Sequence, residues 1–193
     1  MRSDFENEIK KTTVGVPYIT KLPFDGMTDA EILEKLNICL KLGNYKWKDG
    51  KVSGAVYNFD EELIKLITEV YGKASYTNPL HPDIFPGVCK MEAEVIRITA
   101  SLFNGNEETC GTMTTGGTES IIMACKAYRD FAREEHGVFK PNIVMPTTAH
   151  TAFDKAAQYL GLHVKTVKID PVTMKVDLKD MENAITKNTI MVR

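Results

Sequence analysis

The chain has 193 residues, of which 43% are hydrophobic and 26% are charged, and its formal net charge is -2. This balance is that of an ordinary globular protein able to bury a core. The small net charge and the lack of a basic cluster indicate no nucleic-acid partner. No apolar run is long enough to span a membrane. The four cysteines are scattered without a Cys-x-x-Cys pair, which is typical of reduced core thiols in the cytosol.

The first residues predict an arm followed by a helix. Residues 1–27 are polar and contain turn signals, so we expect them to lie outside the core. A helix over 28–42 is predicted by a capping box, in which Thr28 is followed three residues later by Glu31. Its apolar residues recur on one face, as they do in a helix that packs against a core.

Two more helices are expected before the middle of the chain. The segment 60–72 has acidic residues in its first turn, and Gly72 is expected to end it. The segment 88–103 carries apolar residues along one side and predicts a long helix. Three prolines between these helices predict that 74–87 is a loop.

The second half alternates between two kinds of segment. Short apolar runs typical of strands occupy 110–115, 142–146, 163–169 and 189–192. Amphipathic segments that predict helices occupy 118–135, 152–161 and 177–185. Asp177 is expected to cap the last helix, and Gly161 is expected to end the one before it. The alternation predicts an α/β fold, with a mainly parallel sheet flanked by helices.

Two adjacent glycines, Gly116 and Gly117, lie where a predicted strand meets a predicted helix. A helix N-terminus offers unpaired N–H groups to an anion, and glycine lets the anion come close. Thr115, Thr118 and Ser120 add hydroxyl donors. The motif lacks the lysine of a nucleoside-triphosphate loop and is not Gly-x-Gly-x-x-Gly, so it predicts the phosphate of a cofactor or substrate. A plain strand-to-helix turn is an equal alternative on the motif alone.

His150 follows the predicted strand 142–146, at the start of the next helix. Ligands of open α/β sheets bind at such strand ends, and a flat imidazole there could stack on a planar cofactor. The alternative is a histidine that only caps or packs at the helix start. With the glycine pair at the same kind of position, we expect both features on one edge of the sheet.

The loop after residue 77 carries Asn78, His81 and Asp83 among prolines, which stiffen a loop. Such side chains could bind an anion or a polar head group, or could form a solvated surface loop. No two histidines or cysteines have the spacing of metal ligands, so no metal site is expected.

Four segments of the chain resemble the sphingosine-1-phosphate lyase family: 53–57, 78–87, 116–130 and 149–157. The family consists of pyridoxal-phosphate enzymes with the aspartate-aminotransferase-like fold, fold type I, and is related to the amino-acid decarboxylases. The similarity runs from about Pro23 to the end of the chain. Because the segments are long and in family order, the match is more specific than any one motif.

The resemblance implies a cofactor, a reaction and residue roles. Gly116, Gly117 and Thr118 would hold the phosphate of pyridoxal 5'-phosphate, and His150 would stack on its ring. The implied substrate-binding residues are Tyr57, Asn78 and His81. The reaction would cleave a phosphorylated sphingoid base into phosphoethanolamine and a long-chain aldehyde.

The chain departs from the family pattern in one respect. The family's Schiff-base lysine, in a Thr-His-Lys segment, and the aspartate that pairs with the pyridine nitrogen have no counterpart here. We therefore assign no catalytic residue and expect an N-terminal, truncated part of the enzyme that is inactive by itself. In this interpretation 1–104 is an arm and helical segment, and 105–193 is the first part of the cofactor-binding domain.

The resemblance also implies properties of the full-length enzyme. It would be a homodimer, and a eukaryotic member would lie at the cytosolic face of the endoplasmic reticulum membrane, held by a segment absent here. Two alternatives stay open. One is an amino-acid decarboxylase relative with the same cofactor, and the other is a non-catalytic fragment.

Overall fold

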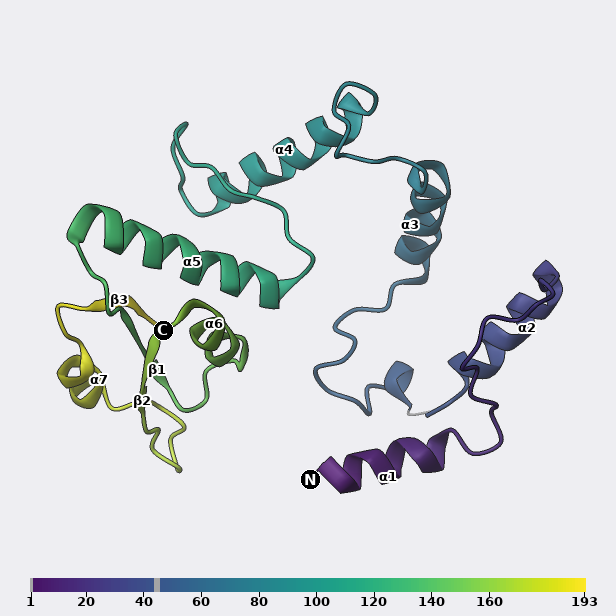
Figure 1. The fold of residues 1–193 in the computed structure, drawn as a ribbon, viewed down its shortest axis with the longest axis horizontal. Helices are drawn as coiled ribbons and strands as arrows, with labels where there is room; N and C mark the ends of the chain where they lie inside the picture. Colours follow the sequence, from purple (N-terminus) through teal and green to yellow (C-terminus); the bar gives the residue numbers. More distant parts are fainter. Residues whose placement is uncertain (1, 44–45) are drawn as a thin grey trace. The chain divides into compact units, whose positions relative to one another are not determined.

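A computed structural model of the chain describes residues 2–43 and 46–193. The chain forms two compact units, 1–77 and 78–193. The first unit contains α1 (Arg2–Thr12), α2 (Asp29–Leu40), the short 3-10 helix η1 (Trp47–Asp49) and α3 (Glu61–Ala74) (Figure 1). The second contains α4 (Pro86–Leu102), α5 (Gly117–His136), β1 (Asn142–Pro146), α6 (Ala152–Leu160), β2 (His163–Val167), α7 (Leu178–Ala184) and β3 (Thr189–Val192). The predicted functional boundary between residues 104 and 105 stays a prediction.

Two helices of the first unit, α2 and α3, begin where the sequence predicts. At α2 the capping box is confirmed, because the Thr28 amide donates to the Glu31 carboxylate at 2.8 Å and the Thr28 hydroxyl accepts the Glu31 amide. The carboxylate of Asp60 caps α3. The prediction that Gly72 ends this helix is wrong, since α3 continues to Ala74. A glycine ends a helix by adopting a left-handed conformation, which Gly72 does not do. The expected arm also contains a helix, α1.

The apolar faces of three helices are exposed. None of the residues of α2, α3 and α4, all of which the structure describes, is buried. Leu33, Ile67 and Ile98 are 58%, 54% and 60% exposed. A helix with an apolar face gains most of its stability from packing, and within the described residues these three faces are left largely uncovered.

The sheet formed by the described residues is parallel and has the order β2-β1-β3. Alternate residues of the central strand face opposite sides. Ile143 and Met145 pack in a cluster with α5 and α6, and Val144 packs with Met181 of α7. The helices therefore cover both faces, which confirms the predicted α/β fold. Of the four cysteines, all free, only Cys125 is buried, and this burial raises the pKa of its thiol.

One predicted strand is absent. Residues 110–115 lie outside the sheet, whose edge strands are β2 and β3, and they form no strand of their own. A strand requires a neighbour to complete its hydrogen bonds, and 110–115 has none among the described residues. The glycine pair therefore follows an extended segment instead of a strand, and the expectation that it shares a sheet edge with His150 is wrong.

The other helices and strands predicted for the second unit are present. The strands β1, β2 and β3 lie where expected, Asp177 caps α7, and Gly161 ends α6 with a φ of 68°. The structure also shows how β1 is joined to β3. The buried amide of Asn142 donates to Thr186 Oγ1 at 3.1 Å and accepts from Thr189 Oγ1 at 2.8 Å. No helix of the described residues is long and apolar enough to cross a membrane.

Candidate cofactor and substrate site

The glycine pair opens α5. Gly116 is the N-cap residue, and its carbonyl accepts the amide of Ser120 at 3.0 Å, which is the first hydrogen bond of the helix. Because Gly116 has no side chain, it cannot cap the amides of Gly117, Thr118 and Glu119. Three neighbouring N–H donors are therefore left at a helix N-terminus, where the helix dipole also favours an anion.

The space in front of these amides is open. A Cβ added at Gly117 would meet no heavy atom within 4 Å, and Gly117 does not have a positive φ. Neither crowding within the described chain nor backbone conformation requires a glycine there. The lack of a Cβ leaves room for a group that approaches from outside, as a phosphate would.

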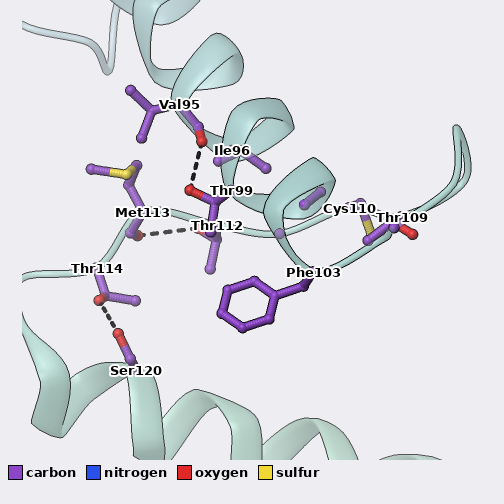
Figure 2. A pocket seen from close by; sticks show the side chains of 13 residues that line it. Val95, Ile96, Thr99, Phe103, Thr109, Cys110, Thr112, Met113, Thr114 and Ser120 are labelled. Atoms are coloured by element: carbon purple, nitrogen blue, oxygen red, sulfur yellow. Dashed lines mark hydrogen bonds between the residues drawn. The ribbon is translucent and has the colours of Figure 1, made fainter.

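Two side-chain bridges brace the turn. Thr114 Oγ1 and Ser120 Oγ lie 2.6 Å apart, and these side chains point toward each other (Figure 2). On the other bridge, Oε2 of Glu119 accepts both the amide and the hydroxyl of Thr115, each at 2.6 Å. The hydroxyl and the amide of Thr115 lower the pKa of Glu119. Sequence reasoning missed Glu119, although a Thr and a Glu separated by Gly-Gly-Thr were visible.

A cavity of about 590 Å³ lies beside the turn. Ile96, Thr99 and Phe103 line it from α4 and its C-terminal end, and Met113, Thr114 and Ser120 line it from the glycine turn (Figure 2). The predictions identified Ser120 only as a hydroxyl donor and did not identify the cavity. Of its α4 wall, only Val95 belongs to the apolar face that was visible as a helical pattern.

The wall at the end of α4 is held by Arg97. Its guanidinium donates to the carbonyl of Thr109 at 2.6 Å and to that of Asn106 at 3.2 Å. The helix ends at Leu102, Asn104 follows it with a φ of 58°, and the amide of Gly105 donates to Ala100 O at 2.8 Å. A Cβ at Gly105 would lie 2.9 Å from the side chain of Thr109, so this close turn requires glycine.

His150 lies after β1, at the start of α6, as predicted. Its Nδ1 accepts the amide of Ala152 at 3.0 Å, so in the neutral ring the proton is on Nε2. The side chain thus caps the helix, and the residue remains exposed. Ala149 and the first turns of α5, through Ile121 and Ile122, pack on the same hydrophobic cluster. This cluster joins the segment that carries His150 to the helix that starts at the glycine pair.

Asn78 and His81 belong to one turn. The amide of His81 donates to Asn78 O at 3.1 Å, and the amide of Leu80 donates to Asn78 Oδ1 at 3.1 Å. Both residues are exposed, and the turn leads directly into α4. The side chains of these two predicted substrate residues are therefore presented by a short ordered segment.

Tyr57 belongs to the first unit and is 91% exposed. The segment that carries it is closed at its base by Trp47 and Phe59, whose rings meet edge to face with centroids 5.1 Å apart. The ammonium of Lys48 lies 4.6 Å from the centroid of the Phe59 ring. This aromatic clasp, Trp47, Lys48 and Phe59, holds both ends of the segment and leaves Tyr57 outside it.

The chain matches the model of the pyridoxal-dependent decarboxylase conserved domain over residues 20–192. It belongs to the pyridoxal-dependent decarboxylase family. This confirms the predicted cofactor, pyridoxal 5'-phosphate. The residues of the glycine turn fit that group, since the uncapped amides and the open space at Gly117 suit a phosphate. In residues 2–43 and 46–193, no cluster of three or more His, Cys, Asp or Glu could hold a metal ion.

Individual relatives support the predicted resemblance. The chain is 58% identical over 190 residues to the sphingosine-1-phosphate lyase of Drosophila melanogaster, covering 98% of this chain and 35% of the relative. It is 47% identical to sphingosine-1-phosphate lyase 1 of Mus musculus, covering 98% of this chain and 33% of the relative. The chain therefore spans about a third of the length of these curated relatives.

Solved structures confirm the fold type. The sphingosine-1-phosphate lyase of Burkholderia pseudomallei superposes with a TM-score of 0.83 at 36% identity, over 93% of this chain and 43% of that structure. The glutamate decarboxylase of Lactobacillus brevis superposes with a TM-score of 0.66 at 16% identity, over 96% of this chain and 44% of that structure. The second similarity shows the fold alone. The prediction of a fold type I enzyme is confirmed.

Proposed function

We propose that the full-length protein is a lyase that uses pyridoxal 5'-phosphate to cleave phosphorylated sphingoid bases. The cleavage, a retro-aldol step between carbons two and three, gives phosphoethanolamine and a long-chain aldehyde. The observation that carries the proposal is the 58% identity to a sphingosine-1-phosphate lyase over 98% of this chain. All four segments that carry the resemblance lie within the matched family domain, residues 20–192.

In this proposal the start of α5 holds the phosphate of the cofactor. The amides of Gly117 and Thr118 donate to it, and Gly116 forms the turn that leaves those amides uncapped. His150 would contact the ring of the cofactor, and the hydrogen bond from the Ala152 amide would orient its imidazole. When bound, the cofactor supplies an electron sink for the carbon–carbon bond that breaks. The residues assigned here bind and orient, and we assign none of them to proton transfer.

Tyr57, Asn78 and His81 contact the substrate near its phosphate. All three are exposed, and each offers a donor that suits a phosphate oxygen. The turn at Asn78 and the aromatic clasp below Tyr57 limit the freedom of these side chains, which reduces the entropy lost on binding.

We also propose that the full-length protein is a homodimer with its active sites at the subunit interface. The exposed apolar faces of α2, α3 and α4 support a larger assembly, because a chain in water hides such faces. A position at the cytosolic face of the endoplasmic reticulum membrane rests on the family resemblance.

Product analysis tests the reaction. Full-length protein supplied with pyridoxal 5'-phosphate should convert a phosphorylated sphingoid base to phosphoethanolamine and an aldehyde, both detectable by mass spectrometry. Release of carbon dioxide from amino acids, with no aldehyde from the sphingoid base, would replace the proposal with the decarboxylase alternative.

A variant tests the substrate assignment. His81→Ala should raise KM for the phosphorylated substrate with a smaller effect on kcat, since His81 binds the substrate in its ground state and its transition state alike. The exposed Phe139→Ala variant of the second unit serves as a matched control. An unchanged KM in His81→Ala would contradict the assignment.

A further inference from the structure

We infer that Glu119 is a positioning residue for the phosphate site at the start of α5. Its carboxylate holds Thr115, the residue before the glycine pair, so that the amides after the pair stay open to a phosphate. The inference rests on the proposed function, because it assumes that this turn binds the cofactor phosphate. It adds a residue outside the resemblance-implied set Gly116, Gly117, Thr118 and His150.

The contact is specific in its geometry. One oxygen, Oε2, accepts the Thr115 amide at 2.6 Å and the Thr115 hydroxyl at 2.6 Å. Both hydrogen bonds favour the ionised carboxyl, and they lower the pKa of Glu119 from its ordinary value of 4.5. At neutral pH the side chain is therefore a carboxylate bound to Thr115.

The bridge spans the two glycines of the turn. Gly116 and Gly117 lie between Thr115 and Glu119, and glycine loses more backbone freedom on ordering than any other residue. A tie across the pair lowers this freedom before a ligand arrives. The bridge between Thr114 and Ser120 crosses the same two glycines, so the turn is closed by two ties.

A negatively charged residue beside a phosphate site requires an explanation, and Glu119 is such a residue. A carboxylate in the first turn repels an incoming phosphate, and this repulsion weakens binding. The side chain is folded back onto Thr115, so its carboxylate oxygen accepts hydrogen bonds from Thr115 instead of from the first amides of the helix. The amides of Gly117 and Thr118 therefore stay available to a ligand. The geometry therefore points to a role in shaping the turn, which an uncharged acceptor of the same length could also fill.

The test compares three variants of the full-length protein by titration with pyridoxal 5'-phosphate, followed by absorbance. Glu119→Ala removes the acceptor and should raise Kd for the cofactor about tenfold, because both hydrogen bonds to Thr115 are lost. Glu119→Gln keeps an acceptor oxygen without the charge and should bind as tightly as the unmodified protein or more tightly. Thr115→Val removes one of the two bonds and should give an intermediate Kd.

Hydrogen exchange provides a readout independent of the cofactor. In cofactor-free protein, the Thr115 amide should exchange faster in Glu119→Ala and at the unmodified rate in Glu119→Gln. If Glu119→Ala does not fold, the test becomes a comparison of Kd for the cofactor between Thr115→Val and Glu119→Gln.

Two results would overturn the inference alone. The first is normal cofactor binding by Glu119→Ala, or by Thr115→Val if Glu119→Ala does not fold. The second is an equal loss of cofactor affinity in Glu119→Gln and Glu119→Ala. A full-length unmodified protein that binds no pyridoxal 5'-phosphate would overturn the proposed function, and the inference with it.

Discussion

His150 Nδ1 accepts the amide of Ala152 at 3.0 Å, so the imidazole caps α6 while the residue as a whole remains exposed. The two interpretations that the sequence left open, a capping histidine and a stacking histidine, are therefore compatible. The cap is present in the structure, and it fixes the plane of the ring that the proposed cofactor would contact. The two roles can be separated by substitution because they use different parts of the side chain.

His150→Phe keeps a flat ring and loses the cap, whereas His150→Asn keeps a capping acceptor and loses the ring. We expect His150→Asn to weaken cofactor binding more, because a stacked ring contributes about 0.5–1.5 kcal/mol. His150→Phe should lower the melting temperature more, since loss of the hydrogen bond to the Ala152 amide costs about 0.5–1.5 kcal/mol. Cofactor titration and thermal denaturation of the full-length protein measure the two effects. Stronger cofactor loss in His150→Phe would exclude stacking.

Gly117→Ala should weaken cofactor binding without weakening the fold. The new Cβ meets no protein atom within 4 Å, and the position does not have a positive φ. It would enter the space reserved for the phosphate, and we expect Kd to rise by roughly tenfold, or about 1.4 kcal/mol.

Gly161→Ala is the matched control for this change. Gly161 has a φ of 68°, so alanine is strained there, and the variant should be less stable by about 1 kcal/mol or more. In its folded state it should bind the cofactor normally. The prediction for Gly117→Ala is wrong if the two variants change equally in unfolding free energy and in Kd for the cofactor.

Trp47→Ala should weaken substrate binding indirectly. Trp47 belongs to the aromatic clasp, and the clasp closes the segment that carries Tyr57. The variant loses the contact between the Trp47 and Phe59 rings, which stabilises the closed segment around Tyr57 by about 0.5–1.5 kcal/mol. We expect KM for the phosphorylated substrate to rise by about two- to tenfold, with kcat less affected. Steady-state kinetics on the full-length protein measure both constants, with the 93%-exposed Tyr18→Ala as control. A raised KM in Tyr57→Ala but not in Trp47→Ala would disprove the role of the clasp.

Asn142→Ala should destabilise the sheet. The variant removes the two hydrogen bonds of the Asn142 amide, to the hydroxyl of Thr186 and from that of Thr189, each worth about 0.5–1.5 kcal/mol. The free energy of unfolding from denaturant titration measures this cost. Asn183→Ala, at an exposed position of α7, is the control. Equal stability of the two variants would show that the buried amide contributes nothing.

Asp130→Asn should remove a pH dependence of stability. Hydrogen bonds from Arg129 and Lys126 lower the pKa of Asp130 from 3.8 to about 2 in the folded chain. Its contribution is therefore present above about pH 4 and is lost as the pH falls toward 2. The difference in unfolding free energy between the unmodified protein and the variant should shrink over this range. A constant difference would contradict the prediction, and Asp154→Asn at an exposed position of α6 controls for net charge.

Much of the fold could be predicted because its signals are local. The capping residues Thr28 and Asp177, the stop at Gly161 and the apolar runs of the strands each act within a few residues of where they occur. The glycine pair, His150 and the family segments were visible for the same reason.

The sequence by itself thus determined the α/β order, the start of α5 at the glycine pair and the family with its cofactor. Only the tertiary structure decided that 110–115 forms no strand, that Glu119 holds Thr115, and that Asn142 joins β1 to β3. Each of these depends on a partner supplied by another segment or by the shape of a turn. A strand exists only beside a neighbour, and a carboxylate has a role only once the backbone has brought its donors within reach.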